Sequence, residues 1–234
     1  MQNLLNLFTD VAGFFKDEPL VAWISVGTIV VLIGILFLIC LKSKNDGFDT
    51  KKMAYAGICI ATSFALSFVK FKFIPSGSIT VASLVPIMLY AYFFGTVSGL
   101  LVGIIHGLLQ FIESAWLYNA TTFLLDYPIA FASIAMMGLA RKFIKKELPA
   151  LTVGVLLTYL CRFLAHLISG FIYFGGGIIE TSIPHSNMFL YSFIYQISYV
   201  GPDMIIALVV TITLSATKTI QTLEKLINKN RATN

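Results

Sequence analysis

The sequence predicts an all-α integral membrane protein with seven transmembrane helices. Of its 234 residues, 58% are hydrophobic and 12% are charged, and the mean hydropathy is +0.88. Soluble proteins contain about 25% charged residues. The apolar residues form repeated runs, and about 20 of them in succession cross a hydrocarbon core about 30 Å thick. Basic residues lie between alternate runs, as the positive-inside rule requires of cytoplasmic loops.

The first predicted span covers residues 20–41, which carry no charge. It lies too far from Met1 to be a cleaved signal peptide. Because positive charge accumulates in cytoplasmic loops, we expect the N-terminus outside the cell and the linker after this span inside. The basic residues of that linker are Lys42, Lys44, Lys51 and Lys52.

Six further spans follow, and a nearly uncharged turn at residues 94–96 separates two of them. Counting the crossings places the basic loop at 141–147 (RKFIKKE) in the cytoplasm, together with the basic C-terminal segment. The predicted topology is therefore N-out and C-in. The six spans are predicted at residues 53–69, 79–94, 97–113, 120–140, 150–173 and 188–214.

Several function classes lack support in the sequence. The three cysteines stand singly in apolar stretches, without the spacing of a metal site or a disulfide framework. There is no HExxH zinc motif, no nucleophile elbow and no Walker-type phosphate loop. We therefore expect no catalytic residues, no metal and no cofactor. His106, in the stretch GIIHGLL, is interpreted as a helix-packing residue.

An acidic residue interrupts one predicted span, in the stretch FLLDYPIAF at residues 123–131. A charged side chain at the centre of a bilayer costs roughly 3 kcal/mol on insertion scales. Such a residue faces a cavity or a partner, so Asp126 points to a bound polar ligand of cationic character.

The predicted topology brings other polar and aromatic side chains to a similar depth. At 1.5 Å per residue, Asp126 lies roughly 9 Å below the outer surface. An acid, an imidazole, an amide and several aromatic rings in one layer are typical of a small-molecule pocket. The other members of this layer are His166, Tyr191, Gln196, Trp116 and Tyr118.

Each member also has a structural explanation. Asp126 is then an acid paired with Arg162 or His166, and His166 is a packing residue. The aromatic residues belong to the interfacial belt, and Gln196 bonds between helices. Arg162 lies one turn from His166, and Asp203 lies on the same helix face as Gln196, so we predict a structural ion pair between Arg162 and Asp203.

Small residues recur every four positions in the span at 53–69, at Gly57, Ala61 and Ala65. Such a stripe lets another helix approach closely. Internal packing and docking of a partner protein both explain it, and the residues alone leave the choice open.

Four stretches of the chain closely resemble the thiamine-specific substrate-binding component (S-component) of energy-coupling factor (ECF) transporters. FLLDYPIAFA, RFLAHLISGFIYFGG and LYSFIYQISYVGP occur in the family's order, and IPSGSITVASLVPIMLYAYFFG resembles its first external loop and the following helix. The similarity extends over residues 53–214.

The resemblance implies a six-helix protein of the cell membrane that binds thiamine from outside and catalyses no reaction. It would deliver thiamine inward with a shared module, made of a transmembrane coupling protein and two cytoplasmic ATPases. Nucleic acid is not an expected partner. The expected organisation is an extra N-terminal helix and cytoplasmic linker at 1–50, the six-helix thiamine-binding core at 51–217, and a basic cytoplasmic tail at 218–234.

The resemblance also implies roles for individual residues. The family's pocket carboxylate falls on Asp126, its pocket histidine on His166 and its pocket tyrosine on Tyr191. The aromatic rings expected beside the vitamin fall on Phe174 and on Trp116 or Tyr118. The helix that docks on the coupling protein matches the stripe of Gly57, Ala61 and Ala65, which favours the partner explanation.

Two positions depart from the family pattern. Gln196 stands where the pattern has Asn, and Gly77 replaces an aromatic residue of some relatives. The longer amide either makes the same hydrogen bonds after a small shift or marks a related ligand. The alternatives are therefore an S-component for a thiamine precursor or another vitamin, a membrane-embedded enzyme with Asp126 and His166 as an acid–base pair, and a structural membrane subunit.

Overall fold

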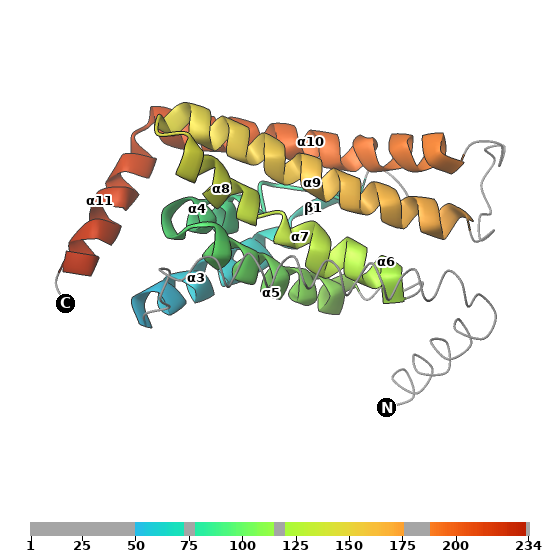
Figure 1. Ribbon diagram of the computed structural model, residues 1–234, viewed down its shortest axis with the longest axis horizontal. Helices are drawn as coiled ribbons and strands as arrows, with labels where there is room; N and C mark the ends of the chain where they lie inside the picture. Colours follow the sequence, from blue (N-terminus) through green and yellow to red (C-terminus); the bar gives the residue numbers. More distant parts are fainter. Residues whose placement is uncertain (1–49, 73–77, 115–119, 176–187, 233–234) are drawn as a thin grey trace.

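The computed structural model describes residues 50–72, 78–114, 120–175 and 188–232, which are almost entirely helical (Figure 1). The predicted first span, the extra helix at 1–50, Trp116 and Tyr118 lie outside these residues. The elements are α3 (Thr50–Ser67), β1 (Lys70–Lys72), β2 (Ser78–Thr80), α4 (Val85–Phe94), α5 (Thr96–Ser114), α6 (Ala120–Leu124), the π-helix η1 (Leu125–Ile129), α7 (Ala130–Ala132), α8 (Ala135–Phe143), α9 (Glu147–Gly175), α10 (Met188–Ala216) and α11 (Thr219–Ala232).

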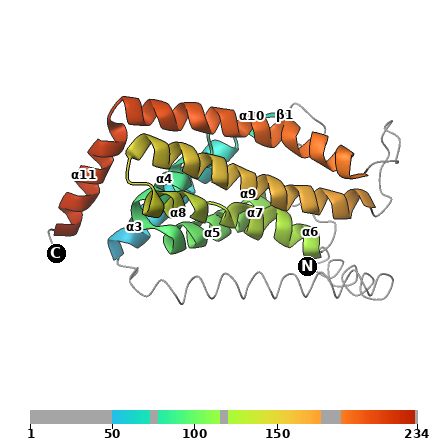
Figure 2. The same cartoon turned by 45° about the horizontal axis from the view of Figure 1, so that its top comes forward.

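The two longest described helices, α9 and α10, lie side by side along the bundle (Figures 1 and 2). The continuous path from α6 to α8 packs against α9 and separates it from α5. Helices α3 and α4 pack beside α5, and α11 crosses one end of the bundle. The core is formed where these layers meet, with residues such as Ile87, Met137 and Leu151 fully buried.

Four described helical stretches are long and apolar enough to cross a membrane: Thr96–Glu113, Ala120–Phe143, Glu147–Phe171 and Phe189–Ala216. Their outer faces are apolar as well. On α9, exposed residues recur every four positions at Leu156, Leu160, Leu164 and Ile168, which places them on one helix face. An exposed apolar stripe of this length suits contact with lipid, as expected of a membrane protein.

The predicted continuous span at 79–94 is wrong in its first part. Residues Ser78–Thr80 instead form β2, which pairs antiparallel with β1. Helix α4 starts only at Val85, next to a proline in its first turn, where the missing N–H costs no hydrogen bond. Its ten residues span about 15 Å, half of a hydrocarbon core. The turn expected at 94–96 is present at Gly95, whose φ of 93° favours glycine.

The predicted span at 120–140 is one helical path with a change of winding inside it. Residues 125–129 form a π-helix that contains Pro128. Because proline has no N–H to donate, the regular pattern of α-helical hydrogen bonds is interrupted there. Single π-turns inside α-helices are frequent at functional sites.

A glycine face on α5 lets η1 and α7 approach closely. A Cβ at Gly107 would lie 2.5 Å from the carbonyl oxygen of Tyr127, and one at Gly103 would overlap that of Phe131. The stripe on α3 differs, because Gly57, Ala61 and Ala65 are exposed and a Cβ at Gly57 would have nothing within 4 Å. Among the described residues, the stripe that serves internal packing is therefore the one on α5.

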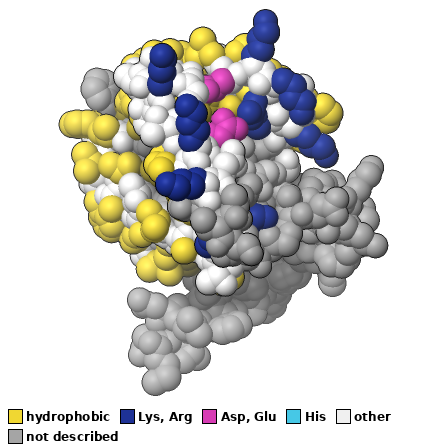
Figure 3. Space-filling model, turned by 90° about the vertical axis from the view of Figure 1, so that its left-hand side faces the viewer, with side chains coloured by type: hydrophobic (Ala, Val, Ile, Leu, Met, Phe, Trp, Pro, Cys, Tyr) yellow, Lys and Arg dark blue, Asp and Glu magenta, His cyan; other side chains and the backbone are white. Residues whose placement is uncertain are grey.

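The segment expected to be a basic tail forms α11 and packs on the bundle. Ile220 and Ile227 of this helix are buried. Glu147, at the start of α9, accepts hydrogen bonds from Ser215 at 2.6 Å and from the amide of Gln221 at 2.9 Å. The loop 141–147 and the C-terminal segment thus lie at the same end of the molecule, where basic side chains gather (Figure 3).

We predict that Gly107→Ala lowers the melting temperature of the purified protein, because the added methyl group presses on the Tyr127 carbonyl oxygen. Overpacking of this kind costs about 1–3 kcal/mol. The control is Gly57→Ala, the same change at an exposed position on α3, which should leave the melting temperature unchanged or slightly raised. Equal melting temperatures for the two variants would contradict the close approach.

Candidate ligand-binding site

The carboxylate of Asp126 lies between η1 and α9. Its Oδ1 is 2.9 Å from Nδ1 of His166, and its Oδ2 accepts a 2.7 Å hydrogen bond from the Ser169 hydroxyl. The side chain of Asp126 is 18% exposed and that of His166 is 9% exposed. Asp126 is therefore mostly enclosed, with a part of its surface still open to a bound molecule.

The local structure explains why Asp126 faces α9. The glycine face of α5 supports η1 from one side, and α9 packs against it from the other. The π-turn changes the direction of successive side chains relative to a regular α-helix. Asp126, in the first turn of η1, thus reaches His166 and Ser169, which lie three residues apart on α9.

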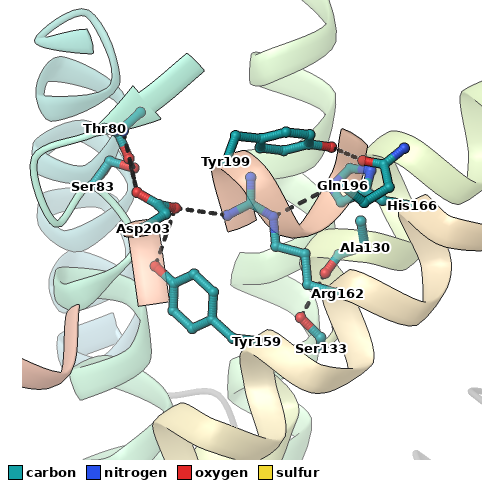
Figure 4. Close-up of polar contacts among 10 residues, drawn as sticks. All are labelled: Thr80, Ser83, Ala130, Ser133, Tyr159, Arg162, His166, Gln196, Tyr199 and Asp203. Carbon is teal, nitrogen blue, oxygen red and sulfur yellow. Dashed lines mark hydrogen bonds and ion pairs between the residues drawn. The ribbon is translucent and has the colours of Figure 1, made fainter. Parts of the chain in front are cut away.

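One turn from His166, the guanidinium of Arg162 connects this site to a second buried acid. Its Nε donates to Nε2 of His166 at 3.4 Å, and its Nη1 donates to Oδ2 of Asp203 at 3.1 Å (Figure 4). The guanidinium carbon lies 4.9 Å from the ring centroid of Phe131. The predicted ion pair between Arg162 and Asp203 is confirmed, and the acid of the site, Asp126, pairs with His166 instead of Arg162.

Asp203 also binds groups from two other elements. Its Oδ1 accepts hydrogen bonds from the Thr80 hydroxyl at 2.8 Å and from the Thr80 backbone N–H at 3.2 Å. Its Oδ2 accepts from the Tyr159 hydroxyl at 3.2 Å. With 3% of its surface exposed, Asp203 is a buried acid whose oxygens are satisfied by β2 and α9 (Figure 4).

On α10, three tyrosines spaced four residues apart form a row, and Tyr199 at one end of it contacts the candidate amide. The Tyr199 hydroxyl donates to Oε1 of Gln196, and its ring centroid lies 6.0 Å from that of His166. Tyr195 lies between Tyr199 and Tyr191, with centroid separations of 5.8 Å and 6.3 Å. Gln196 is thus connected to His166 through Tyr199, while Tyr191 lies one turn farther along the row.

The structure brings together Asp126, His166 and Gln196, as the predicted depths require. Phe174 lies in the last turn of α9, but its side chain is outside the described part of the chain, as are Trp116 and Tyr118. The sequence-based prediction missed two residues that contact site residues, Ser169 beside Asp126 and Tyr199 beside Gln196. Their signal was available, because each follows a predicted site residue by three positions on the same helix face.

The chemistry of this cluster favours recognition of a polar molecule. An ionisable acid, an imidazole, an amide and phenols can donate and accept hydrogen bonds. Among the described residues, no group of three or more His, Cys, Asp or Glu side chains has the arrangement of a metal site. His106 lies elsewhere, fully buried, with its ring 5.2 Å from that of Phe131, which agrees with the packing role expected for it.

Comparison with known proteins gives consistent results. A model of the family described as "Thiamine transporter protein (Thia_YuaJ)" matches residues 53–223. The thiamine transporter ThiT of Bacillus subtilis (strain 168) is 30% identical over 178 residues, which cover 71% of this chain and 91% of that protein. The solved structure of ThiT from Listeria monocytogenes matches with a TM-score of 0.57 at 20% identity, covering 75% of this chain and 96% of that one.

We predict that Asp203→Ala destabilises the ligand-free protein strongly, because it leaves Arg162 buried without its acid and removes the acceptor of Thr80. Breaking a buried ion pair costs about 3–5 kcal/mol. Glu224→Ala removes the acid of a more exposed pair with Arg141, at 3.5 Å, and should cost about 1 kcal/mol or less. Thermal unfolding in detergent compares the two, and similar losses would show that Asp203 has no special structural role.

Proposed function

The chain belongs to the thiamine transporter family, and we propose that it is a thiamine-binding S-component of an ECF-type uptake transporter. It is a transport protein and not an enzyme. The observation that carries the proposal is the Asp126 carboxylate, partly open and held between η1 and α9 by contacts with His166 and Ser169.

Thiamine carries a permanent positive charge on its thiazolium ring, and Asp126 supplies a matching negative charge in an apolar bundle. Within the described residues, no lysine or arginine contacts the Asp126 carboxylate. An unpaired carboxylate in such surroundings is unfavourable, whereas the same group beside a cation is favourable. A bound cation therefore supplies the positive charge that no lysine or arginine of the described residues supplies to Asp126.

The remaining site residues supply orientation. We propose that Tyr191 and Gln196 hydrogen-bond to the aminopyrimidine ring or the hydroxyl of thiamine. His166, whose two ring nitrogens face Arg162 and Asp126, is proposed to line the ligand beside them. Because the Tyr199 hydroxyl occupies Oε1 of Gln196, the amide N–H groups are the part of Gln196 that serves a ligand. Phe174, together with Trp116 or Tyr118, is proposed to offer a ring face to the cation, a contact worth roughly 0.5–2 kcal/mol.

We further propose that the protein crosses the cell membrane seven times, with its N-terminus outside and its C-terminus in the cytoplasm. The organisation is then the extra helix at 1–50, the thiamine-binding core at 51–217 and a cytoplasmic segment at 218–234, here folded as α11. The gathering of the loop 141–147 and α11 at one basic end supports this orientation.

A coupling protein with two cytoplasmic ATPases is the proposed partner. The stripe of Gly57, Ala61 and Ala65 supports this, because it is exposed and unused by internal packing among the described residues. Small residues allow the backbone of a second helix to approach closely. The coupling protein would therefore dock along α3.

A thiamine precursor or another vitamin is the second candidate ligand, and it is favoured by Gln196, where the family pattern has a shorter amide. Titration of the purified protein with thiamine and with its uncharged pyrimidine moiety separates the two. Tight binding of the pyrimidine moiety alone would refute thiamine as the cargo.

For the wild-type protein we predict tighter binding of thiamine than of the pyrimidine moiety, and Asp126→Asn should remove most of this difference. A hydrogen bond to a charged group contributes about 1.5–3 kcal/mol, so thiamine affinity should fall about tenfold to a hundredfold. Isothermal titration calorimetry measures the affinity of each variant for both ligands. The control is Glu224→Gln, which removes an acid at the opposite end of the bundle and should leave both affinities unchanged. Unaltered thiamine binding by Asp126→Asn would place the cation elsewhere.

We predict that the double substitution of Gly57 and Ala61 by leucine leaves thiamine affinity intact and abolishes uptake by cells that carry the coupling module. The larger side chains project from an exposed face of α3, so they block a docked helix without disturbing the core. Substitution of Leu156 and Leu160 by alanine, on the exposed face of α9, is the control. If the leucine variant transported thiamine normally, α3 would not be the docking surface.

A further inference from the structure

We infer that Arg162 is a positioning residue that fixes the protonation of His166 and thereby reserves the Asp126 carboxylate for a cationic ligand. This inference rests on the proposed function for its ligand, but its physical basis is the set of contacts around the imidazole. Two side chains, Arg162 on α9 and Asp126 on η1, determine which ring nitrogen carries the proton.

The first step is the contact between Arg162 and His166. A guanidinium has five N–H donors, no acceptor, and a charge that it keeps at all physiological pH values. Its Nε lies 3.4 Å from Nε2 of His166, so this ring nitrogen faces a donor and must present its lone pair. A neutral imidazole has one proton, and the proton is therefore on Nδ1.

The second step is the contact between His166 and Asp126. With its proton on Nδ1, the imidazole donates to Oδ1 of Asp126 across 2.9 Å, and Ser169 donates to Oδ2 across 2.7 Å. Both donors are neutral. Asp126 accepts two hydrogen bonds that fix its orientation, yet it keeps its full negative charge.

The third step is the charge of the connected group. Arg162 and Asp203 cancel one another across 3.1 Å, and the neutral His166 adds nothing. Asp126 is left as one uncompensated negative charge, so the group of two acids and one permanent cation has a net charge of −1. A ligand with a single positive charge neutralises it.

Arg162 is needed because the position of the ring alone does not decide between the two neutral tautomers. With its proton on Nε2, the ring would present a lone pair to Asp126, and the carboxylate would lose one of its two donors. Arg162 opposes this, since a proton on Nε2 would be directed at the guanidinium N–H. The ring of Phe131 and the Asp203 carboxylate hold the guanidinium in position.

Other titratable groups near the ring do not change this assignment. From the elements packed against this part of α9, the groups that face His166 are Asp126 on η1 and Tyr199 on α10, whose hydroxyl is engaged by Gln196. Asp203 on α10 reaches the ring only through Arg162. Arg162 is therefore the permanent cation beside the imidazole.

The first test is nitrogen NMR of the ligand-free protein with labelled histidine. The sequence has three histidines, so a His166→Asn variant identifies the resonances of this ring. At about pH 7, we expect a neutral ring with its proton on Nδ1. A proton on Nε2, or a charged imidazolium, would overturn the inference. Because no thiamine is present, this result is independent of the proposed ligand.

The second test uses the double variant Arg162→Met with Asp203→Asn, which removes the cation and its acid together and leaves the group at a net charge of −1. Without the guanidinium, nothing holds the proton on Nδ1, so nitrogen NMR of the ligand-free variant should show a proton on Nε2 of His166 in part of the molecules. Thiamine affinity of the variant should fall about tenfold or more relative to the wild-type protein.

The matched control is Tyr159→Phe, which removes one hydrogen bond from Asp203 and keeps the contact between Arg162 and His166. Its histidine resonances should match those of the wild-type protein. A proton fixed on Nδ1 in the double variant, as in the wild-type protein, would reduce Arg162 to a structural residue. Absence of thiamine binding at every pH by the wild-type protein would refute the proposed function and leave the NMR result standing.

Discussion

The structure depends on one energetic constraint, which is that a charged group inside an apolar bundle needs an opposite charge and hydrogen-bond partners. Arg162 and Asp203 are both largely withdrawn from solvent, and each is satisfied by several contacts at once. Asp203 in particular joins α10 to α9 and to β2, so a short hairpin can lie beside the bundle with the Thr80 backbone N–H satisfied. Polar backbone is tolerated at membrane depth only where protein supplies such partners. Asp126 has no lysine or arginine partner among the described residues, so a cationic ligand can supply the opposite charge.

Close backbone approach is the second requirement of the site. The glycine face of α5 allows η1 to pack against it more closely than any larger side chain would permit. The π-turn at Pro128 then presents Asp126 to α9. The position of the Asp126 carboxylate thus depends on Gly103, Gly107 and Pro128 as well as on its hydrogen-bond partners. Packing, and not the polar residues alone, sets the geometry of the cluster.

Much of this arrangement could be predicted from the sequence, because membrane depth and helix periodicity are simple quantities. They bring Asp126 near His166 and predict the pairing of Arg162 with Asp203. Hydropathy could not distinguish one long span at 79–94 from a strand followed by a short helix, since the stretch is mostly apolar in either case. Nor does it predict that the polar C-terminal segment packs as α11, because the decisive contacts of Glu147 join residues far apart in the chain. Ser169 and Tyr199 each follow a predicted site residue by three positions, so helix periodicity could have found them, whereas membrane depth alone does not.

Among the described residues, hydrogen bonds join α9 and α10 at three levels along their length. At the basic end, Glu147 in the first turn of α9 accepts hydrogen bonds from Ser215 of α10 and from Gln221 of α11. Farther along, Tyr159 and Arg162 donate to Asp203. Beside His166, which lies 19 residues or about 28 Å from Glu147, the Ser192 hydroxyl donates to the Leu167 backbone carbonyl at 3.0 Å. The two helices are therefore held together at the site as well as at the basic end, and their spacing around a ligand does not depend on the contact with α11.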